Sequence, residues 1–451
     1  MSQESAEIGQ HAAEAQRFRS YALLDALAGR RSRRFAKGMK LNGGPLMYES
    51  GRSPEPLSGE EEAALAFAAC GVTGYALAEL PYETGQRPDA GGGNIMKQFV
   101  GRTVPSADAL HPVTVFVTND NGTWMLLRPQ DFASPEIAEL IQASRQRQLA
   151  ELYERSRVRI ASKRVDVPRE LPYVPPFNKW SANVPGSTYF IPVNELTALY
   201  LNILLSCFSA DFSYFIVDER NGFRPAGIGR FARSKGGPLH DDPRDGRFMT
   251  VGFLESWLFE LAAVEQGAVV QNLGLMGQAL ALGGFPHFAA HPFGWTQALG
   301  FRMEEPRFSR TIAASRLLNL ALKVSGKDIP IPTAVGLEHD GQILIKPYCP
   351  PYHSSMREAV LAFVDTKFAL GKGAFRDGGD ATAWLDGRRV QAGIPEYPKA
   401  AVEATIQYCE YVYGRYGRFP AACGPFRTVL AYQAHRLDPD FYDQFYRAES
   451  L

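Results

Sequence analysis

Three short turn signals, separated by long helical patterns, constrain the fold of this chain most strongly. Asn-Gly or Asp-Gly pairs stand between apolar runs at positions 121–122, 221–222 and 340–341. Such pairs select tight turns that join neighbouring antiparallel strands. A charged helical pattern covers about 135–159, and a nearly apolar one covers about 253–282. Antiparallel hairpins mixed with long helices, without regular βαβ alternation, predict an α+β fold.

Other local signals predict single elements. Ser58 and Glu61 have the spacing of a capping box and predict the start of an Ala-rich helix. The apolar run 196–208 is too short to span a bilayer and predicts a buried helix. The Pro-rich stretch 166–187 predicts a connector or a lid.

Composition argues against a nucleic-acid binder and against a secreted protein. The formal net charge is zero, which argues against a dedicated nucleic-acid binder. Five dispersed cysteines without Cys-x-x-Cys spacing predict reduced thiols, and the polar N-terminus lacks the apolar core of a secretion signal. We therefore expect a soluble cytoplasmic protein that binds neither nucleic acid nor membrane.

The basic stretch 26–38, ALAGRRSRRFAKG, is the first candidate for a binding site. It follows a short helical pattern at about 21–27 and contains Arg30, Arg31, Ser32 and Arg34. Guanidinium forks match phosphate oxygens, and a serine hydroxyl adds a donor. The residues alone leave two interpretations open: a pocket for one phosphate group, or a solvated basic run.

The second candidate is the stretch 101–117, GRTVPSADALHPVTVFV, which leads into a strand expected to be buried. Pro105 and Ser106 could aim a hydroxyl and backbone amides at a planar ligand, or they could form an ordinary turn. His111 is either a ligand contact or a structural histidine with satisfied hydrogen bonds.

The third candidate is the end of the long apolar helix, ALALGGFPHF, residues 279–288. Gly283 and Gly284 would allow a sharp turn with positive φ and would expose backbone N–H groups. A core helix with a glycine stop is the alternative. His287 and His291 follow, either as an aromatic pocket wall or as a core turn.

Taken in order, RRSRRF, PSADALHP and the glycine-ended helix resemble the FMN-dependent nitroreductase family, most closely its azoline-oxidising dehydrogenase branch. The resemblance covers about residues 20–305, with long insertions between 125 and 250. It implies that Arg30, Arg31, Ser32 and Arg34 bind the flavin phosphate. It also implies that Pro105 and Ser106 lie beside the flavin ring, and that Gly283 and Gly284 contact its reactive N5 edge.

The same resemblance implies the rest of the expected fold and function. The α+β fold would be nitroreductase-like, with an antiparallel-rich central sheet surrounded by helices. A nitroreductase-like flavin-binding domain would cover 19–325, after a flexible tail at 1–18, and a C-terminal extension packed on the core would cover 326–451. FMN would accept hydride at N5 from NADH, NADPH or a substrate and pass it to an unknown small molecule. Family members are usually homodimers, so a homodimer is expected.

The alternative is a degenerate member of the family that lacks FMN and serves as a binding or interaction module. Two departures support it: Phe35 follows Arg34 directly, and Ala109 stands where many members carry an asparagine. Arg307 and Arg310 are candidates to complete the phosphate site. No metal site is expected. Cys349 is a candidate redox thiol, although no neighbouring residue in the sequence is an obvious cause of a lowered pKa.

Overall fold

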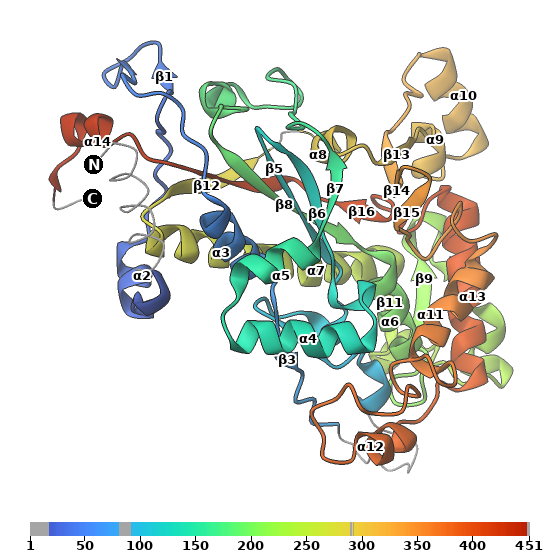
Figure 1. Cartoon of the computed structure of the whole chain (residues 1–451). Coiled ribbons are helices and arrows are strands. Elements are labelled where there is room, and N and C mark those ends of the chain that lie inside the picture. Colours follow the sequence, from blue (N-terminus) through green and yellow to red (C-terminus); the bar gives the residue numbers. More distant parts are fainter. Residues whose placement is uncertain (1–17, 81–91, 289–290, 292, 449–451) are drawn as a thin grey trace.

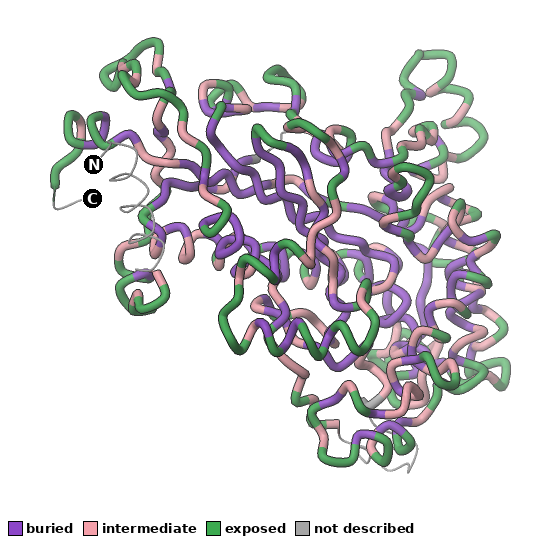
Figure 2. The backbone as a smooth tube through the Cα atoms, in the orientation of Figure 1, coloured by how far each residue is buried: buried purple, intermediate pink, exposed green. Residues whose placement is uncertain are grey.

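The computed structural model describes residues 18–80, 92–288, 291 and 293–448 (Figure 1). The expected flexible tail, 1–18, lies outside the described residues except for Phe18. The strands of the central sheet are mostly buried, and exposed residues gather on the surrounding helices and loops (Figure 2). Within the described part of the chain, no helix is long and apolar enough to cross a membrane.

An antiparallel sheet forms the centre of the fold. Its strands run in the order β12, β17, β8, β5, β6, β7, and β16 also pairs with β8. Every neighbouring pair in this sheet is antiparallel. Its members are β5 (Val113–Asn119), β6 (Gly122–Leu126), β7 (Arg157–Ala161), β8 (Thr188–Glu195), β12 (Gly283–Phe288), β16 (Phe426–Arg427) and β17 (Leu430–His435).

The remaining strands form small sheets around the centre. They are β1 (Lys40–Leu41), β2 (Tyr48–Glu49), β3 (Val72–Tyr75), β4 (Val100–Arg102), β9 (Phe215–Asp218), β10 (Arg224–Pro225), β11 (Phe248–Thr250), β13 (Arg302–Glu304), β14 (Thr333–His339) and β15 (Gln342–Ile345). The helices are α2 (Leu23–Gly29), α3 (Gly59–Cys70), α4 (Ser134–Arg145), α5 (Leu149–Ser156), α6 (Thr197–Cys207), α7 (Val251–Ala279), α8 (Gly294–Ala298), α9 (Phe308–Thr311), α10 (Arg316–Val324), α11 (Met356–Phe368), α12 (Gly387–Gly393), α13 (Lys399–Tyr416) and α14 (Pro439–Phe445). This combination confirms the predicted α+β class.

Both faces of the central sheet are covered, because alternate side chains of each strand point to opposite sides. Val115 and Phe190 pack with α3, α5 and α7, which lie together on one side of the sheet (Figure 1). Phe116 and Ile191 face the other way and pack with the connector before β8 and with Trp295 of α8. The predicted connector 166–187 therefore forms part of the core on that side.

The hairpin signals are confirmed with differences in turn length. Asp340 and Gly341 form a two-residue turn with φ of 48° and 77°, as expected for a type I′ hairpin. Asn119 pairs with Gly122, so the first turn is Asp120–Asn121, one residue before the expected pair. The pair Asn221–Gly222 closes a longer loop, because Asp218 pairs with Arg224 around a 3₁₀ turn.

The C-terminal part of the chain does not form a separate extension. β17 lies inside the central sheet between β12 and β8, so residues after 326 complete the core that the earlier residues begin. The expected boundary at 325/326 therefore does not divide the fold. Helices α11 and α13 also pack with α6 around the small sheet of β9, β10 and β11.

The predicted capping box at the start of α3 is confirmed. Ser58 Oγ accepts from the Glu61 backbone N–H at 3.3 Å, and the Glu61 carboxylate accepts from the Ser58 N–H at 2.7 Å. Arg436, just after β17, donates to the same carboxylate at 2.9 Å. The N-terminus of α3 is thus tied to the C-terminal strand of the sheet.

Replacing Ser58 with alanine is expected to lower the free energy of unfolding by about 1 kcal/mol, because the substitution removes the acceptor for an orphan helix N–H. Urea denaturation measures the change. Ser134→Ala is the matched control, since the N-cap of α4 is Ala133 and Ser134 is exposed. Equal losses in the two variants would contradict a capping role for Ser58.

Candidate functional site

The arginine run lies against the start of β12. The Gly284 N–H donates to the Arg33 carbonyl at 3.0 Å, and Arg33 and Gly284 form an antiparallel bridge. Ala36 makes a second bridge with Leu437, just after β17. The structure therefore brings together two of the three sequence motifs, the arginine run and the Gly283–Gly284 pair, at one corner of the central sheet.

Arg34 points into the protein. Its Nη2 donates to Asn178 Oδ1 at 2.6 Å and to Ser181 Oγ at 3.2 Å, both on the connector before β8. The guanidinium lies 5.0 Å from the Trp180 ring centre and 4.6 Å from that of Phe285. Burial lowers the pKa of Arg34. These contacts give Arg34 a structural role as a clamp between the connector and β12.

The other residues of the run divide into an inward and an outward group. Arg33 Nη2 donates to Gln278 Oε1 at 2.7 Å, near the end of α7. Arg30, Arg31 and Ser32 are exposed. In the described part of the chain, neither exposed arginine forms an ion pair with a carboxylate, so both guanidinium groups can reach an external anion.

Gly283 and Gly284 do not form the expected turn. Both residues are extended in β12, and the positive φ at the end of α7 belongs to Ala281, at 56°. A Cβ at Gly283 would lie 2.5 Å from His435 Nε2, and one at Gly284 would lie 2.2 Å from Tyr432 Oη. The glycines are thus required by the close approach of β17 side chains, and the Gly284 N–H already donates to Arg33.

Pro105 and Ser106 lie at a different place along α7. Ser106 Oγ accepts from the His111 N–H at 2.8 Å, and His111 Nε2 lies 2.7 Å from the Val100 carbonyl. The ring of His111 is buried, and burial holds its pKa well below the usual value. These contacts give His111 a structural position, but its hydrogen bonds are only partly satisfied, because Nδ1 has no partner among the described residues.

The position of that turn is fixed by a buried ion pair. Arg102 Nη2 donates to Glu265 Oε1 at 2.5 Å, in the middle of α7. Glu265 precedes Gln278, the partner of Arg33, by about 20 Å of helix at 1.5 Å per residue. The exposed Arg30 meets α7 closer to Glu265, since a Cβ at Gly274 would lie 3.6 Å from Arg30 Cδ. A ligand that touched both Pro105–Ser106 and Arg30 would have to extend over roughly 14 Å of helix.

A buried polar cluster, Gln433 and His287, lies beside Arg34. Gln433 and His287 are fully buried, and neither side chain has a hydrogen-bond partner among the described residues. Gln433 pairs with both Phe285 and Tyr189, which places these side chains on one face of the sheet. Burial and the nearby Arg34 charge lower the pKa of His287 to about 4.

The sequence held only part of the signal for this cluster. The sequence predicts His287 as either an aromatic pocket wall or part of a core turn, and its full burial against Tyr189 and Trp295 agrees with a core position. Gln433 carries no motif, because its position beside β12 depends on a pairing between distant parts of the chain. His287 and Gln433 are neutral side chains with unused hydrogen-bonding atoms, beside the corner of the sheet where the arginine run meets β12.

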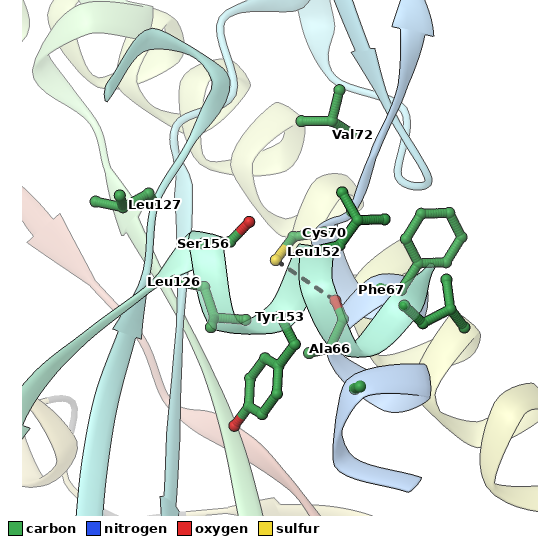
Figure 3. Close-up of a pocket in the computed structure, with 12 residues that line it drawn as sticks. Ala66, Phe67, Cys70, Val72, Leu126, Leu127, Leu152, Tyr153 and Ser156 are labelled. Carbon is green, nitrogen blue, oxygen red and sulfur yellow. Dashed lines mark hydrogen bonds between the residues drawn. The ribbon is translucent and has the colours of Figure 1, made fainter. Parts of the chain in front are cut away.

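A small cavity between α3, α5 and β6 can be set aside as a substrate site (Figure 3). Its volume is about 30 Å³, which is room for about one water molecule, and its walls are mostly apolar. Cys70 lines it and donates to the Ala66 carbonyl at 3.7 Å. Burial raises the pKa of Cys70 to about 11, so its thiol is not activated.

The other chemistry considered from the sequence gains no support. Burial raises the pKa of Cys349 well above its usual value, which disfavours a reactive thiolate. Over the ranges that the structure describes, no group of three or more His, Cys, Asp or Glu side chains lies close enough to hold a metal ion.

Comparison with known proteins gives distant structural similarity only. No protein-family model matches the chain, and no curated protein matches it. Among solved structures, the chain is similar to a protein described as a "putative nitroreductase" from Ralstonia eutropha JMP134. The match covers 62% of this chain and 77% of that one, at 12% identity and a TM-score of 0.28. A similarity of this degree does not define a family for the chain.

Proposed function

We propose that this chain is an FMN-dependent oxidoreductase of the nitroreductase type, acting on a small-molecule substrate as a cytoplasmic homodimer. The observation that carries the proposal is the bridge between Arg33 and Gly284. It joins two motifs that stand in the order of that family, and it holds Arg30, Arg31 and Ser32 in solvent beside the last turns of α7.

The exposed residues fit the phosphate end of FMN. Two guanidinium groups and one hydroxyl offer fixed donors for phosphate oxygens, and no carboxylate among the described residues pairs with them. Arg34 is better suited to support than to contact, because its guanidinium is held by Asn178 and Ser181. Bound FMN would supply the hydride-transfer chemistry, with NADH, NADPH or the substrate as donor.

The ring end of the site fits less closely. The Gly284 N–H donates to Arg33 and is therefore not free to contact a flavin, and Pro105–Ser106 lies farther along α7. These two observations favour a second candidate function. In it, the chain keeps the anion-binding corner but lacks FMN and serves as a binding or interaction module.

An absorbance spectrum of the purified protein, followed by FMN titration, separates the two functions. We expect the near-ultraviolet and blue bands of oxidised flavin. Replacing Arg30 and Arg31 together with alanine is expected to weaken FMN binding at least about 10-fold, because charge-assisted hydrogen bonds to phosphate are lost.

Arg316→Ala is the control variant, because Arg316 is exposed on α10 and outside the arginine run. It should bind FMN as the wild type does. A colourless wild-type protein that takes up no added FMN would exclude the oxidoreductase and leave the binding module.

A further inference from the structure

A second cavity, of about 420 Å³, lies apart from the arginine run. Its walls come from the segment before β4, the turn after β6, the start of α6 and the segments that flank α11. The volume is within the range of small-molecule sites. None of the flavin-site residues proposed above lines it.

Lys97 is the unusual residue of this cavity. Its side chain lines the wall and the residue is only 8% exposed. Among the described residues, its ammonium group forms no ion pair and no side-chain hydrogen bond. A buried charge without a partner is costly, and proteins normally pair or neutralise it.

The charges nearest to Lys97 do not compensate it. Arg128 is a cation that acts on it electrostatically. Lys367 is a second basic group nearby, and burial, together with Lys97, holds its pKa well below the usual value. Arg128 binds Asp131 through two hydrogen bonds of 3.1 Å, which occupies that carboxylate. Burial, and then Arg128, lower the pKa of Lys97 to about 8, so it stays mostly protonated at neutral pH.

The acid Asp108 does not pair with Lys97, because it interacts with Lys367 and its hydrogen-bond partners. Lys367 Nζ donates to Asn202 Oδ1 at 2.5 Å, to Tyr397 Oη at 2.8 Å and to the Asn94 carbonyl at 2.7 Å. Asp108 attracts the Lys367 charge and accepts a hydrogen bond from Asn202 at 3.1 Å. This acid is therefore engaged with Lys367 and not with Lys97.

The other acids of the wall are also occupied. Glu195 accepts from the Thr197 N–H at 2.7 Å and from the Ala198 N–H at 3.2 Å. Asp377 accepts from the Gly379 N–H at 3.1 Å and from Gln391 Nε2 at 2.8 Å. Glu195 thus accepts from the local backbone, and Asp377 accepts from the local backbone and from one distant side chain.

The mouth of the cavity adds two further cations. Lys346 and Lys372 are exposed there, and neither forms an ion pair within the ranges that the structure describes. The wall thus holds four basic side chains against three carboxylates. Lys97 in its depth and the two lysines at its mouth have no ion-pair partner among the described residues.

We propose that this cavity binds a small organic anion whose carboxylate or phosphate group supplies the missing counter-charge at Lys97. Lys346 and Lys372 attract a second negative group at the mouth, and the buried side chains of Phe99 and Ile137 contact the carbon skeleton. This inference is independent of the flavin proposal, because the two sites share no residue.

Isothermal titration of the purified chain with succinate and with inorganic phosphate, in separate arms at constant ionic strength, tests the proposal. We expect saturable binding of at least one anion to the wild type. Lys97→Met is expected to weaken it about 10- to 100-fold, because a charge-assisted hydrogen bond is lost. The arm that binds more tightly distinguishes a carboxylate ligand from a phosphate ligand.

Three further variants make the outcome decisive. Lys346→Met with Lys372→Met removes only exposed charges and should weaken binding several-fold, even where Lys97→Met fails to fold. Lys235→Met, an exposed lysine outside the cavity, should change nothing. Absence of saturable binding to the wild type, or equal binding by wild type, Lys97→Met and the double variant, would overturn the proposal. Loss of binding in the Arg30/Arg31 variant alone would do the same, since it would place the anion at the arginine run.

Discussion

Replacing Arg102 with methionine is expected to lower the free energy of unfolding by about 3–5 kcal/mol, because it leaves the Glu265 carboxylate buried without its partner. The side chains of Arg102 and Glu265 are 1% and 4% exposed, and their closest N–O distance is 2.5 Å. Arg102 also donates to the Val113 carbonyl at 3.0 Å, so the substitution breaks the contact between β4, β5 and α7 at one point. Urea denaturation measures the loss.

The control for Arg102→Met is Lys40→Met in an exposed pair. Lys40 and Glu49 lie 2.6 Å apart, with side chains 52% and 68% exposed. Exposed pairs contribute at most about 1 kcal/mol, so this variant should be nearly neutral. Similar losses in the two variants would show that burial adds nothing to the Arg102–Glu265 pair.

The loss in Arg102→Met should also depend on pH. Burial already raises the pKa of Glu265, and Arg102 opposes that rise. Without Arg102 the folded pKa rises further above the unfolded value, so the penalty is small below about pH 4 and grows as pH rises through the folded pKa. Unfolding measurements across this range should show a smaller difference from the wild type in acid than at neutral pH.

Local signals predicted the elements of the fold but not its closure. The hairpin at Asp340–Gly341 and the helix 251–279 follow from turn chemistry and apolar periodicity, which act over a few residues. The place of β17 follows instead from pairing with β12 and β8, both distant in the sequence. Nothing in the run Leu430–His435 distinguishes a central strand from one on the surface of an extension.

The candidate site shows the same division between local and distant information. The arginine run could be recognised as an anion-binding segment, but its pattern could not say which guanidinium groups point outward. That choice depends on Asn178, Ser181 and Gln278, which hold Arg34 and Arg33 from other elements. For the same reason, Lys97 gave no signal: its lack of a counter-charge appears only when Arg128 and Lys367 are placed around it.

Replacing Gly284 with alanine is expected to lower the free energy of unfolding by about 1–3 kcal/mol or more, because the added Cβ overpacks the core. It would lie 2.2 Å from Tyr432 Oη and 2.5 Å from Tyr432 Cζ. Gly267→Ala is the control on the preceding helix, since a Cβ there meets nothing within 4 Å. In an exposed helix interior that substitution should stabilise by up to about 1 kcal/mol. Thermal or urea unfolding compares the two.

A double-variant cycle with Tyr432→Ala identifies the cause. If Gly284 is required by the approach of Tyr432, the alanine at 284 costs less once the ring is gone, with a coupling of about 0.5–3 kcal/mol. If Gly284 instead serves a bound flavin through its backbone, Gly284→Ala should reduce FMN retention, leave the apoprotein as stable as the wild type and show no coupling to Tyr432. The Gly284 N–H already donates to Arg33, so we expect the first result. The glycine pair then belongs to the framework that positions Arg30 and Arg31, and the test of flavin binding rests on those two arginines.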